Sequence, residues 1–523
     1  SAAADLWLSP IPGTEGDLAL GIARVITSEG LVSNENNAAF NAALPGGLGS
    51  HGIVDVANRT GISVDRIENA ARYFAEHTPS VAFGGGSAGA HTNGSFNLGA
   101  IYALNILVGA VDSKGGVISN PSSALDGVPA SATGASFGEW EKELAQWRAG
   151  NVETVIIRGA DIVHGMPNSV AIREALKNVP NVIAFGAIHD DTMDFADLVL
   201  PEQTFLESWG SDIPEPGPGY QVIGTQQPVV GLTISNDESG LISDARGFGD
   251  TLLDMSDGSY GRNMEGLVRG SLSDLHDTGS GSVSASSASL FTDGALQRGG
   301  WWDTSKVGSS SLGKVNTSQK NASYSNTGSL GAGNDFNLIP FHSTSLFDGR
   351  LAASPWAQQT PDPISSASWS TWAEINSKQA DDLGIREGDV LLIRSSSGEI
   401  EALAYPHPGI RPGVIGIPMG QGHHRSGRWA EGRGSNVLSI LVDQKDAATG
   451  ALAWAATQVR VQRAGRRVKV PKFEGNVEAR PVEPGVPVLV VGVGETAHDA
   501  QEANHHEYQK QFLGESRESG EHE

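Results

Sequence analysis

The chain of 523 residues contains no cysteine. These residues therefore cannot supply a disulfide, a zinc ribbon, a cysteine nucleophile or the ligands of a cysteine-bound iron–sulfur cluster. Basic side chains are also scarce, because 35 Lys and Arg stand against 60 Asp and Glu and give a formal net charge of -25. A surface of this sign repels phosphate, so nucleic acid is not an expected partner.

Long apolar runs are missing as well. No stretch reaches the roughly 18 residues that a membrane-spanning helix needs, and no signal peptide is recognisable. The first residue is Ser1 and not methionine, so we expect the chain to be processed or to begin partway through a longer one. Hydrophobic residues make up 39% of the chain, which is enough for a sizeable core, and the length predicts about three domains.

The first part of the chain, residues 1–136, reads as an α/β unit. Apolar residues recur at helical spacing after Ser63, which predicts a helix that ends near His77. The apolar segment 81–83 is then expected to form a short buried strand. A glycine-rich turn and a long apolar helix over about 96–111 follow it.

Residues 137–270 again show an alternation of predicted helices and strands. The segments 154–157 and 181–185 are predicted strands that flank a helix over 169–178, which is the βαβ pattern of a parallel sheet. Residues 197–201 form a third predicted strand. The sequence therefore predicts two α/β units with mainly parallel sheets.

Residues 271–335 differ in composition, with 16 Ser and 10 Gly among 65 residues. No strand or helix period persists there, so we expect an insertion or linker that is ordered only where Trp301 and Trp302 anchor it. Residues 336–465 carry closely spaced strand and turn signals typical of a small β-barrel. Residues 466–523 are expected to form an extended C-terminal connection.

Three groups of residues are candidates for chemistry. Gly84, Gly86 and Gly89 match the spacing of a dinucleotide-binding turn, but a tight strand-to-helix turn explains them equally simply. Turns at His342 and over 420–424 follow predicted barrel strands, so their backbone N–H groups could cradle an anionic or polycyclic ligand, or be ordinary barrel turns. The histidines show no zinc-binding spacing, so no metal site and no catalytic residue are expected.

Five sequence blocks, in order, resemble the molybdopterin oxidoreductase (dimethyl-sulfoxide-reductase) family. They are PGTEGDLALG at 12–21, the glycine-rich loop and helix over 84–116, ADLVLP with TFLESWG over 196–210, the segment 374–389, and 420–430. The resemblance implies that the barrel is six-stranded and double-psi-like. It also implies a pterin cleft between the α/β units and the barrel, near Gly84, Gly86, Gly89, Asp161, His342, Gly420, Gly422 and His423.

One departure from the family pattern concerns this cleft. The family has a Gly-x-Asn-Pro turn after the strand of the second α/β unit, whereas this chain has Gly159-Ala160-Asp161-Ile162. The change adds a carboxylate where a ligand phosphate is expected, and repulsion of about 4 kcal/mol acts between two charges 4 Å apart at an effective dielectric near 20. We therefore expect that the eight cleft residues bind no cofactor.

Within the family, the segment 420–441 is most similar to the large subunit of alternative complex III, a quinol-oxidising bacterial membrane complex. This resemblance implies a scaffold subunit that catalyses no step itself and lies peripherally on the extracytoplasmic (periplasmic) face of the cell membrane. Implied partners are an iron–sulfur subunit or domain, a multihaem cytochrome c subunit and integral-membrane quinol-binding subunits. Iron–sulfur clusters and haems are then expected on those partners.

Two alternatives stay open. In the first, the chain is the catalytic subunit of an oxidoreductase with a molybdenum bis-pterin guanine dinucleotide cofactor, such as a polysulfide or thiosulfate reductase. In the second, the chain is a soluble dinucleotide-dependent dehydrogenase, which needs a complete βαβ unit around Gly84, Gly86 and Gly89.

Overall fold

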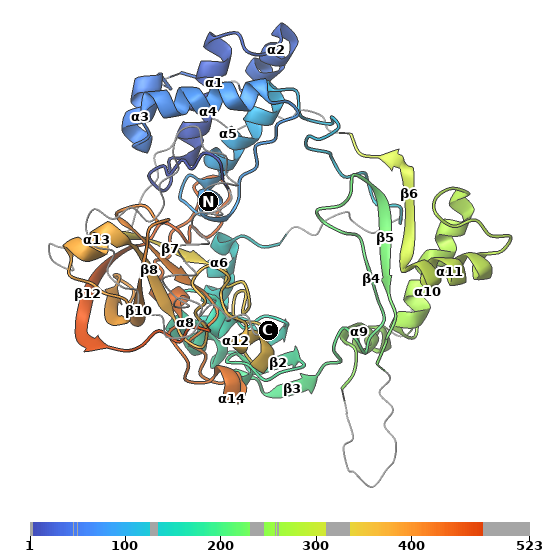
Figure 1. Ribbon diagram of the computed structural model, residues 1–523. Coiled ribbons are helices and arrows are strands. Elements are labelled where there is room, and N and C mark those ends of the chain that lie inside the picture. The colour runs from blue at the N-terminus through green and yellow to red at the C-terminus, as the bar shows by residue number, and fades with distance from the viewer. Residues whose placement is uncertain are drawn as a thin grey trace, which may run out of the picture. The chain divides into compact units, whose positions relative to one another are not determined.

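The computed structural model describes residues 4–44, 47–49, 51–125, 134–230, 245–256, 258, 261–309 and 335–473. Three separate sheets and a group of N-terminal helices make up this part of the chain (Figure 1). No helix in these ranges combines the length and the apolar character needed to cross a bilayer.

The N-terminal unit is helical. Its helices are α1 (Glu15–Ser28), α2 (Asn34–Ala43), α3 (Ile53–Thr60), α4 (Val64–Glu76) and α5 (Gly94–Leu107). The predicted helix after Ser63 is confirmed as α4. Leu20, Ile26, Phe40 and Leu107 are fully buried and belong to one core, so apolar faces of α1, α2 and α5 pack together.

The strand expected at 81–83 is not formed in the described structure, and this prediction was wrong. The backbone of Ala82 pairs instead with a side chain: its N–H donates to Asn105 Oδ1 (2.8 Å), and its carbonyl accepts from Asn105 Nδ2 (2.6 Å). The Asn105 carboxamide thus makes the two backbone hydrogen bonds that a neighbouring strand would make. The turn at Gly86–Gly89 therefore lacks the preceding strand that a dinucleotide-binding βαβ unit requires.

The second unit has the predicted parallel α/β architecture. Its elements are α6 (Phe137–Arg148), β1 (Thr154–Arg158), α7 (Ile162–Gly165), α8 (Ser169–Leu176), β2 (Asn181–Gly186) and β3 (Leu198–Pro201). The strands lie in the order β1-β2-β3 and are all parallel. Ile172, Leu176 and Val182 form part of the core between the sheet and its helices.

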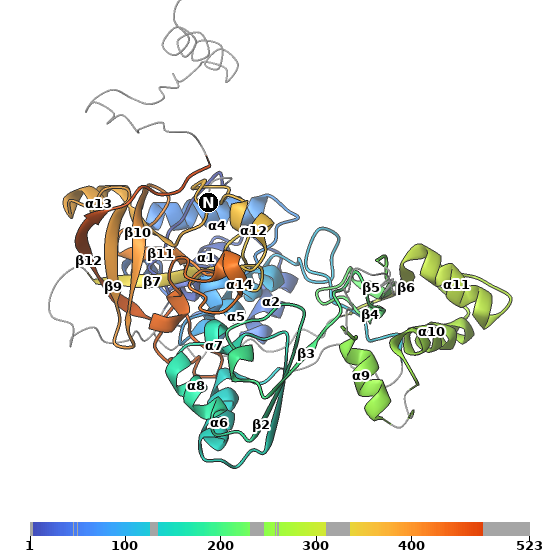
Figure 2. The same cartoon turned by 90° about the horizontal axis from the view of Figure 1, so that it is seen from below.

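A third, antiparallel sheet was not predicted. It contains β4 (Gly210–Asp212), β5 (Tyr220–Gln226) and β6 (Gly300–Val307), beside the helices α9 (Phe248–Met255), α10 (Met264–Leu275) and α11 (Ala288–Arg298) (Figure 2). The Ser/Gly-rich range 271–335 is therefore not simply a linker, because its described part contains α11 and β6. Trp301 is 1% exposed and packs with Leu272 and Phe291, so apolar burial offsets the ordering of this polar segment.

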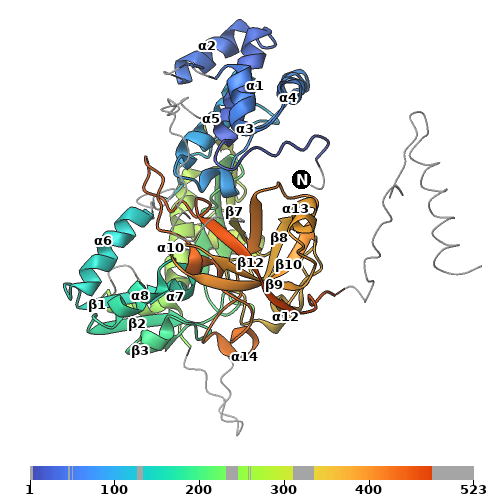
Figure 3. The same ribbon diagram turned by 90° about the vertical axis from the view of Figure 1, so that its left-hand side faces the viewer.

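The closed six-stranded barrel confirms the predicted C-terminal architecture (Figure 3). Its strands are β7 (Asp335–Phe341), β8 (Trp372–Asn376), β9 (Asp389–Arg394), β10 (Glu399–His407), β11 (Val414–Pro418) and β12 (Gln458–Arg467), in the order β10-β8-β11-β7-β12-β9. Short helices α12 (Pro355–Gln359), α13 (Ser377–Asp382) and α14 (Gly427–Ala430) lie in its connections. Most of the predicted C-terminal connection, 474–523, lies outside the described residues.

Candidate functional site: a buried histidine–aspartate cluster

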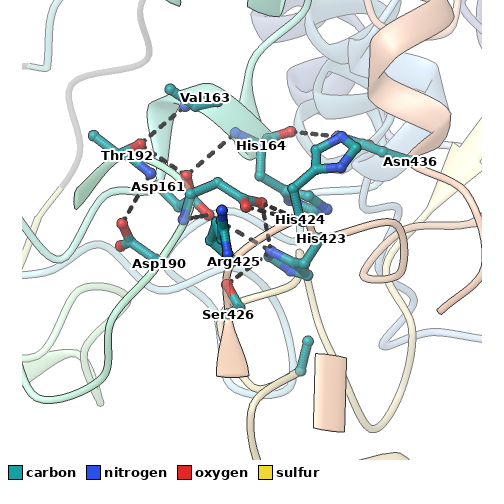
Figure 4. A network of polar contacts seen from close by, with 12 residues as sticks. Asp161, Val163, His164, Asp190, Thr192, His423, His424, Arg425, Ser426 and Asn436 are labelled. Carbon is teal, nitrogen blue, oxygen red and sulfur yellow. Dashed lines mark hydrogen bonds and ion pairs between the residues drawn. The ribbon is translucent and has the colours of Figure 1, made fainter. Parts of the chain in front are cut away.

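Two of the sequence candidates, Asp161 and His423, meet in the structure (Figure 4). Asp161 follows β1 and is the N-cap of α7, where its carboxylate accepts from the His164 N–H at 3.2 Å. The same carboxylate accepts from Thr192 Oγ1 at 2.8 Å and from the Asp191 N–H at 3.3 Å. Asp161 is therefore engaged by its own α/β unit and does not project freely into a cleft.

His423 reaches this carboxylate from the loop after β11. Its Nδ1 lies 3.2 Å from Asp191 Oδ2, 3.6 Å from Asp161 Oδ2 and 3.0 Å from Ser426 Oγ. The Asp191 carboxylate also accepts from the backbone N–H of His424 at 2.9 Å. Since Asp161 and Asp191 belong to the parallel α/β unit and His423 to a barrel loop, the cluster joins these two parts of the fold.

His164 completes the cluster by stacking on His423. The two rings are 3.6 Å apart between centroids and nearly parallel, with an interplanar angle of 8°. His164 Nε2 donates to the carbonyl of Gln421 at 3.1 Å, and the carbonyl of His164 accepts from Asn436 Nδ2 at 2.7 Å. Both bonds tie the α7 helix to the barrel loops.

The two stacked histidines have opposite charge preferences. Burial alone lowers the pKa of His423, but its contacts with Asp161 and Asp191 outweigh burial and raise the pKa to about 9. Burial, together with the charge of His423, lowers the pKa of His164 to about 4. At neutral pH the pair is thus one imidazolium stacked on one neutral imidazole.

The pKa values of the neighbouring carboxylates are shifted as well. Burial tends to raise the pKa of Asp161 and of Asp191, yet the contact with His423 and further hydrogen bonds hold both pKa values below the ordinary range. Asp190, whose carboxylate accepts from the N–H groups of Thr192 and Met193, shows the reverse. Burial, and then the negative charge of Asp161, raise its pKa to about 6.

Glycines at 420 and 422 shape the loop that carries His423. Gly422 has φ +90°, and a Cβ there would lie 2.1 Å from the backbone nitrogen of Asn436. Gly420 has φ +114°, and its Cβ would lie 2.7 Å from Leu346 Cβ. These two candidates are therefore explained by close approach of the backbone.

The remaining candidates lie elsewhere. Gly84, Gly86 and Gly89 belong to the turn before α5, where Asn97 Nδ2 donates to the carbonyl of Ala88 at 2.9 Å. His342 is exposed and stacks on Phe347, with ring centroids 4.4 Å apart. The described contacts do not bring either group to the His423 cluster.

Sequence reasoning missed His164 and Asp191 as members of the site. His164 is one of several scattered histidines, and Asp191 lies in an acidic run with Asp190 and Asp194. Asp191 lies 232 positions before His423, so no local spacing could pair them. The one available signal was that Asp161 and Asp191 each follow a parallel strand, because such strands end at the same edge of a sheet.

Asp161, His164 and His423 also offer atoms close enough to share a metal ion. The geometry argues against that use. Metal-bound imidazoles direct their lone pairs in the ring plane toward the ion, whereas these rings are stacked face to face. His423 Nδ1 and His164 Nε2 are moreover already hydrogen-bonded to Asp191 and Gln421.

A cleft of about 330 Å³ lies beside the cluster, between α8 and the barrel loops. This volume is near the lower limit for one drug-sized ligand, roughly 300–1,000 Å³, and far below what two pterin dinucleotides need. Its charged lining consists of Asp191, Glu399 and Glu401 against Arg173, with His424 beside them. The lining is thus poorly matched to the phosphates of the cofactor that the family resemblance implies.

In this chain a polar cluster joins a parallel α/β unit to a closed six-stranded barrel. Two family models match the chain: "Molybdopterin oxidoreductase" over residues 1–216 and "Molydopterin dinucleotide binding domain" over residues 356–451. The chain belongs to the molybdopterin oxidoreductase family.

Similar proteins agree with this assignment. The chain is 22% identical over 468 residues to "Menaquinone reductase, molybdopterin-binding-like subunit" of Nitratidesulfovibrio vulgaris, covering 88% of this chain and 63% of that protein. It is 32% identical over 140 residues to the molybdopterin-containing subunit of an arsenate respiratory reductase of Chrysiogenes arsenatis, covering 25% and 16%. The chain thus spans less than two thirds of the length of these relatives.

Among solved structures, acetylene hydratase from Pelobacter acetylenicus is similar, with a TM-score of 0.64 over 88% of this chain and 72% of that one. At 18% identity, this similarity shows the fold alone. It confirms the predicted fold class.

Proposed function

We propose that the chain is a cofactor-less, molybdopterin-like scaffold subunit of a quinol-oxidising respiratory membrane complex of the alternative complex III type. In this proposal it lies on the extracytoplasmic face and docks an iron–sulfur subunit or domain, a multihaem cytochrome c and integral-membrane quinol-binding subunits. Electrons then pass through the partners and not through this chain. The similarity to a subunit named "molybdopterin-binding-like" of a menaquinone reductase supports the assembly with quinone-reactive partners.

The observation that carries the proposal is the His423–Asp161–Asp191 cluster. In the family, the turn at 159–161 and the loop at 420–424 are expected to face the pterin. Here Asp161 of that turn, 16% exposed in the side chain, lies beside His423 of that loop, and both contact Asp191; the side chains of His423 and Asp191 are each 3% exposed. His423 Nδ1 and both carboxylates are hydrogen-bonded within the protein, whereas the buried His423 Nε2 has no partner among the described residues. The contact of Nδ1 with the carboxylates favours an ionic contact between the two units in place of a ligand between them.

The lack of cysteine supports the same conclusion for these 523 residues. Neither a cysteine ligand for molybdenum nor a cysteine-bound cluster can come from them. Any redox centre of the complex that requires cysteine must draw it from residues outside these 523.

One observation favours the alternative, a catalytic subunit that holds a molybdenum bis-pterin guanine dinucleotide. The dinucleotide-binding model matches residues 356–451, which include Gly420, Gly422 and His423. On that alternative His423 lies in the cofactor site, and its loss removes activity.

Quinol oxidation by the assembled complex separates the two functions. We expect a complex with His423→Ala to assemble in lower yield but to keep its turnover per assembled complex, because the proposed role of His423 is structural. His189→Ala is the matched control, since His189 is an exposed histidine of the same α/β unit that lies outside the cluster. Complete loss of turnover in a His423→Ala complex that still contains all its subunits would favour the catalytic alternative.

A further inference from the structure

Aromatic and arginine side chains are concentrated in two of the barrel's connections, the one between β7 and β8 and the one between β11 and β12. They are Phe347, Arg350, Trp356, Trp369, Arg428 and Trp429, here called the aromatic–arginine patch. The patch is carried by the connection between β7 and β8 and by the α14 region. The helices α12 and α14, which contain Trp356 and Trp429, are neighbours and lie side by side in the views of Figures 1–3.

The patch is unusual for its exposure. Trp356 is 80% exposed and Phe347 is 42% exposed, whereas side chains of this size normally contribute to a core. Leu351 and Ile364, in the same connection between β7 and β8, are also exposed, at 47% and 56%. Exposed apolar groups that gather in this way are typical of an interaction surface.

Guanidinium groups are stacked on the aromatic rings. Arg428 lies 4.7 Å from the ring centroid of Trp429, Arg433 lies 4.4 Å from that of Trp369, and the two tryptophan rings are 6.3 Å apart. Arg350 lies 5.0 Å from the ring of Phe347. Stacking holds each guanidinium in a defined plane. Asp348 already binds Arg350, and Arg433 Nε donates to the carbonyl of Trp429, so among the described contacts Arg428 is the one of the three whose N–H edge is left for two parallel bonds to a carboxylate.

The backbone of this region is strained. Five non-glycine residues in the described part of the chain have positive φ, and three of them are Phe347 (57°), Ser366 (56°) and Trp369 (59°). Bulky aromatic residues rarely adopt this conformation, which costs of the order of 1–3 kcal/mol and persists where the surroundings impose it. Two aromatic members of the patch are therefore presented by unfavourable backbone.

We propose that the aromatic–arginine patch is a docking surface for a partner polypeptide that presents carboxylates around an apolar centre. Trp and Arg are the side chains most enriched among residues that dominate protein interfaces. Arg428 is exposed and has no carboxylate partner in the described part of the chain, so a partner's Asp or Glu would complete it.

This inference rests on the proposed assembly with other subunits and specifies how one of them is held. The test is the amount of haem and iron that co-purifies with the chain from cells that make the full complex. Arg428→Glu and Trp356→Ala should each lower haem and iron per chain by about tenfold or more, the loss typical of a dominant interface residue. Arg428→Lys should retain more of both than Arg428→Glu.

Arg262→Glu is the matched control, because Arg262 is exposed, is in no ion pair of the described residues and lies far along the chain from the patch. It should leave haem and iron per chain unchanged. Thermal unfolding of the variant chains should match the parent, since the altered side chains are exposed. Unchanged haem and iron in both patch variants would overturn the inference.

Vesicles of phosphatidylglycerol and phosphatidylethanolamine provide the second arm. The inference would also be overturned if the chain floats with these vesicles, Trp356→Ala abolishes this flotation, and the variant still retains its partners. That result would assign the patch to a lipid surface. Molybdenum bound by the chain would refute the proposed scaffold role but would not alter the effect of the patch variants on haem and iron. If the patch variants leave haem and iron unchanged and no molybdenum is bound, only the docking surface is refuted.

Discussion

The two glycine-rich loops of the chain are held in different ways. The loop before α5 is fixed by carboxamides, since Asn105 pairs with the backbone of Ala82 and Asn97 donates to the carbonyl of Ala88. The loop after β11 is fixed by charge, through His423 between Asp161 and Asp191. Carboxamide bonds, together with backbone bonds from Ala455 and Ala447 of the barrel's connections to Ala90 and Thr92, hold the first loop, whereas a buried ionic cluster between two units holds the second.

This difference determines what each loop can tolerate. A lost carboxamide leaves polar backbone groups that water can reach at the half-buried Ala82. A lost imidazolium leaves two carboxylates buried without their counter-charge, which is far more costly. The charged loop is therefore both the stronger connection and the more vulnerable one.

Removing His423 should have the largest effect. We expect His423→Ala to lower the free energy of unfolding by about 3–5 kcal/mol, because Asp161 and Asp191 stay buried and unpaired. His424→Ala is the control, since its side chain is exposed, and should cost less than about 0.5 kcal/mol. Urea denaturation of both variants measures the difference, and equal midpoints would show that the cluster does not stabilise the fold.

Raising the pH should weaken the cluster without any mutation. The folded-state pKa of His423 is raised from 6.5 to about 9, so its contribution is complete below pH 6.5 and is lost as the pH rises through 9. The loss is of the order of 3 kcal/mol. Urea midpoints measured from pH 7 to 10 should fall in the parent and fall much less in His423→Ala.

Glu15, which contacts the loop before α5 through Asn97, titrates over a lower pH range than His423. Burial raises the pKa of Glu15, which accepts from Asn97, from 4.5 to about 7. Its contribution is thus present below pH 4.5 and lost as the pH rises through 7. When the midpoints are also measured from pH 4 to 7, a fall of the parent's midpoints that ends at pH 7 would assign the pH dependence to Glu15 and not to His423.

Removing Asn105 should have the smallest effect. Asn105→Ala deletes two hydrogen bonds to Ala82 and should cost about 1–3 kcal/mol. Because both partners are neutral, we expect this cost to be the same at pH 7 and pH 10. Urea denaturation at the two values checks this, and a cost that changes with pH would mean that the contrast between the loops is wrong.

The sequence predicted those parts of the fold whose signals are local. The parallel strands β1, β2 and β3 have short apolar patterns bounded by turns and were expected, as was a small barrel over 336–465. The antiparallel sheet was missed because β4 has three residues and β5 pairs with β6 more than 70 positions later. No local pattern encodes such a pairing.

The site was predicted in the same partial way. Asp161 and His423 were each singled out from turns that follow strands, but nothing in the sequence placed them in contact. Their partner Asp191 sits in an acidic run that resembles an exposed loop, yet its side chain is 3% exposed. Only the packing of the barrel loop against α7 and β2 shows that this acid is a buried counter-charge.

The central claim is that this ionic cluster stands where the family holds its cofactor. The most direct measurement is the molybdenum content, by mass spectrometry, and the fluorescence of released pterin in the purified complex that contains this chain. The account predicts neither molybdenum nor pterin above the background of a preparation without the chain. One molybdenum and two pterins per chain would contradict it and make the chain a working molybdenum enzyme.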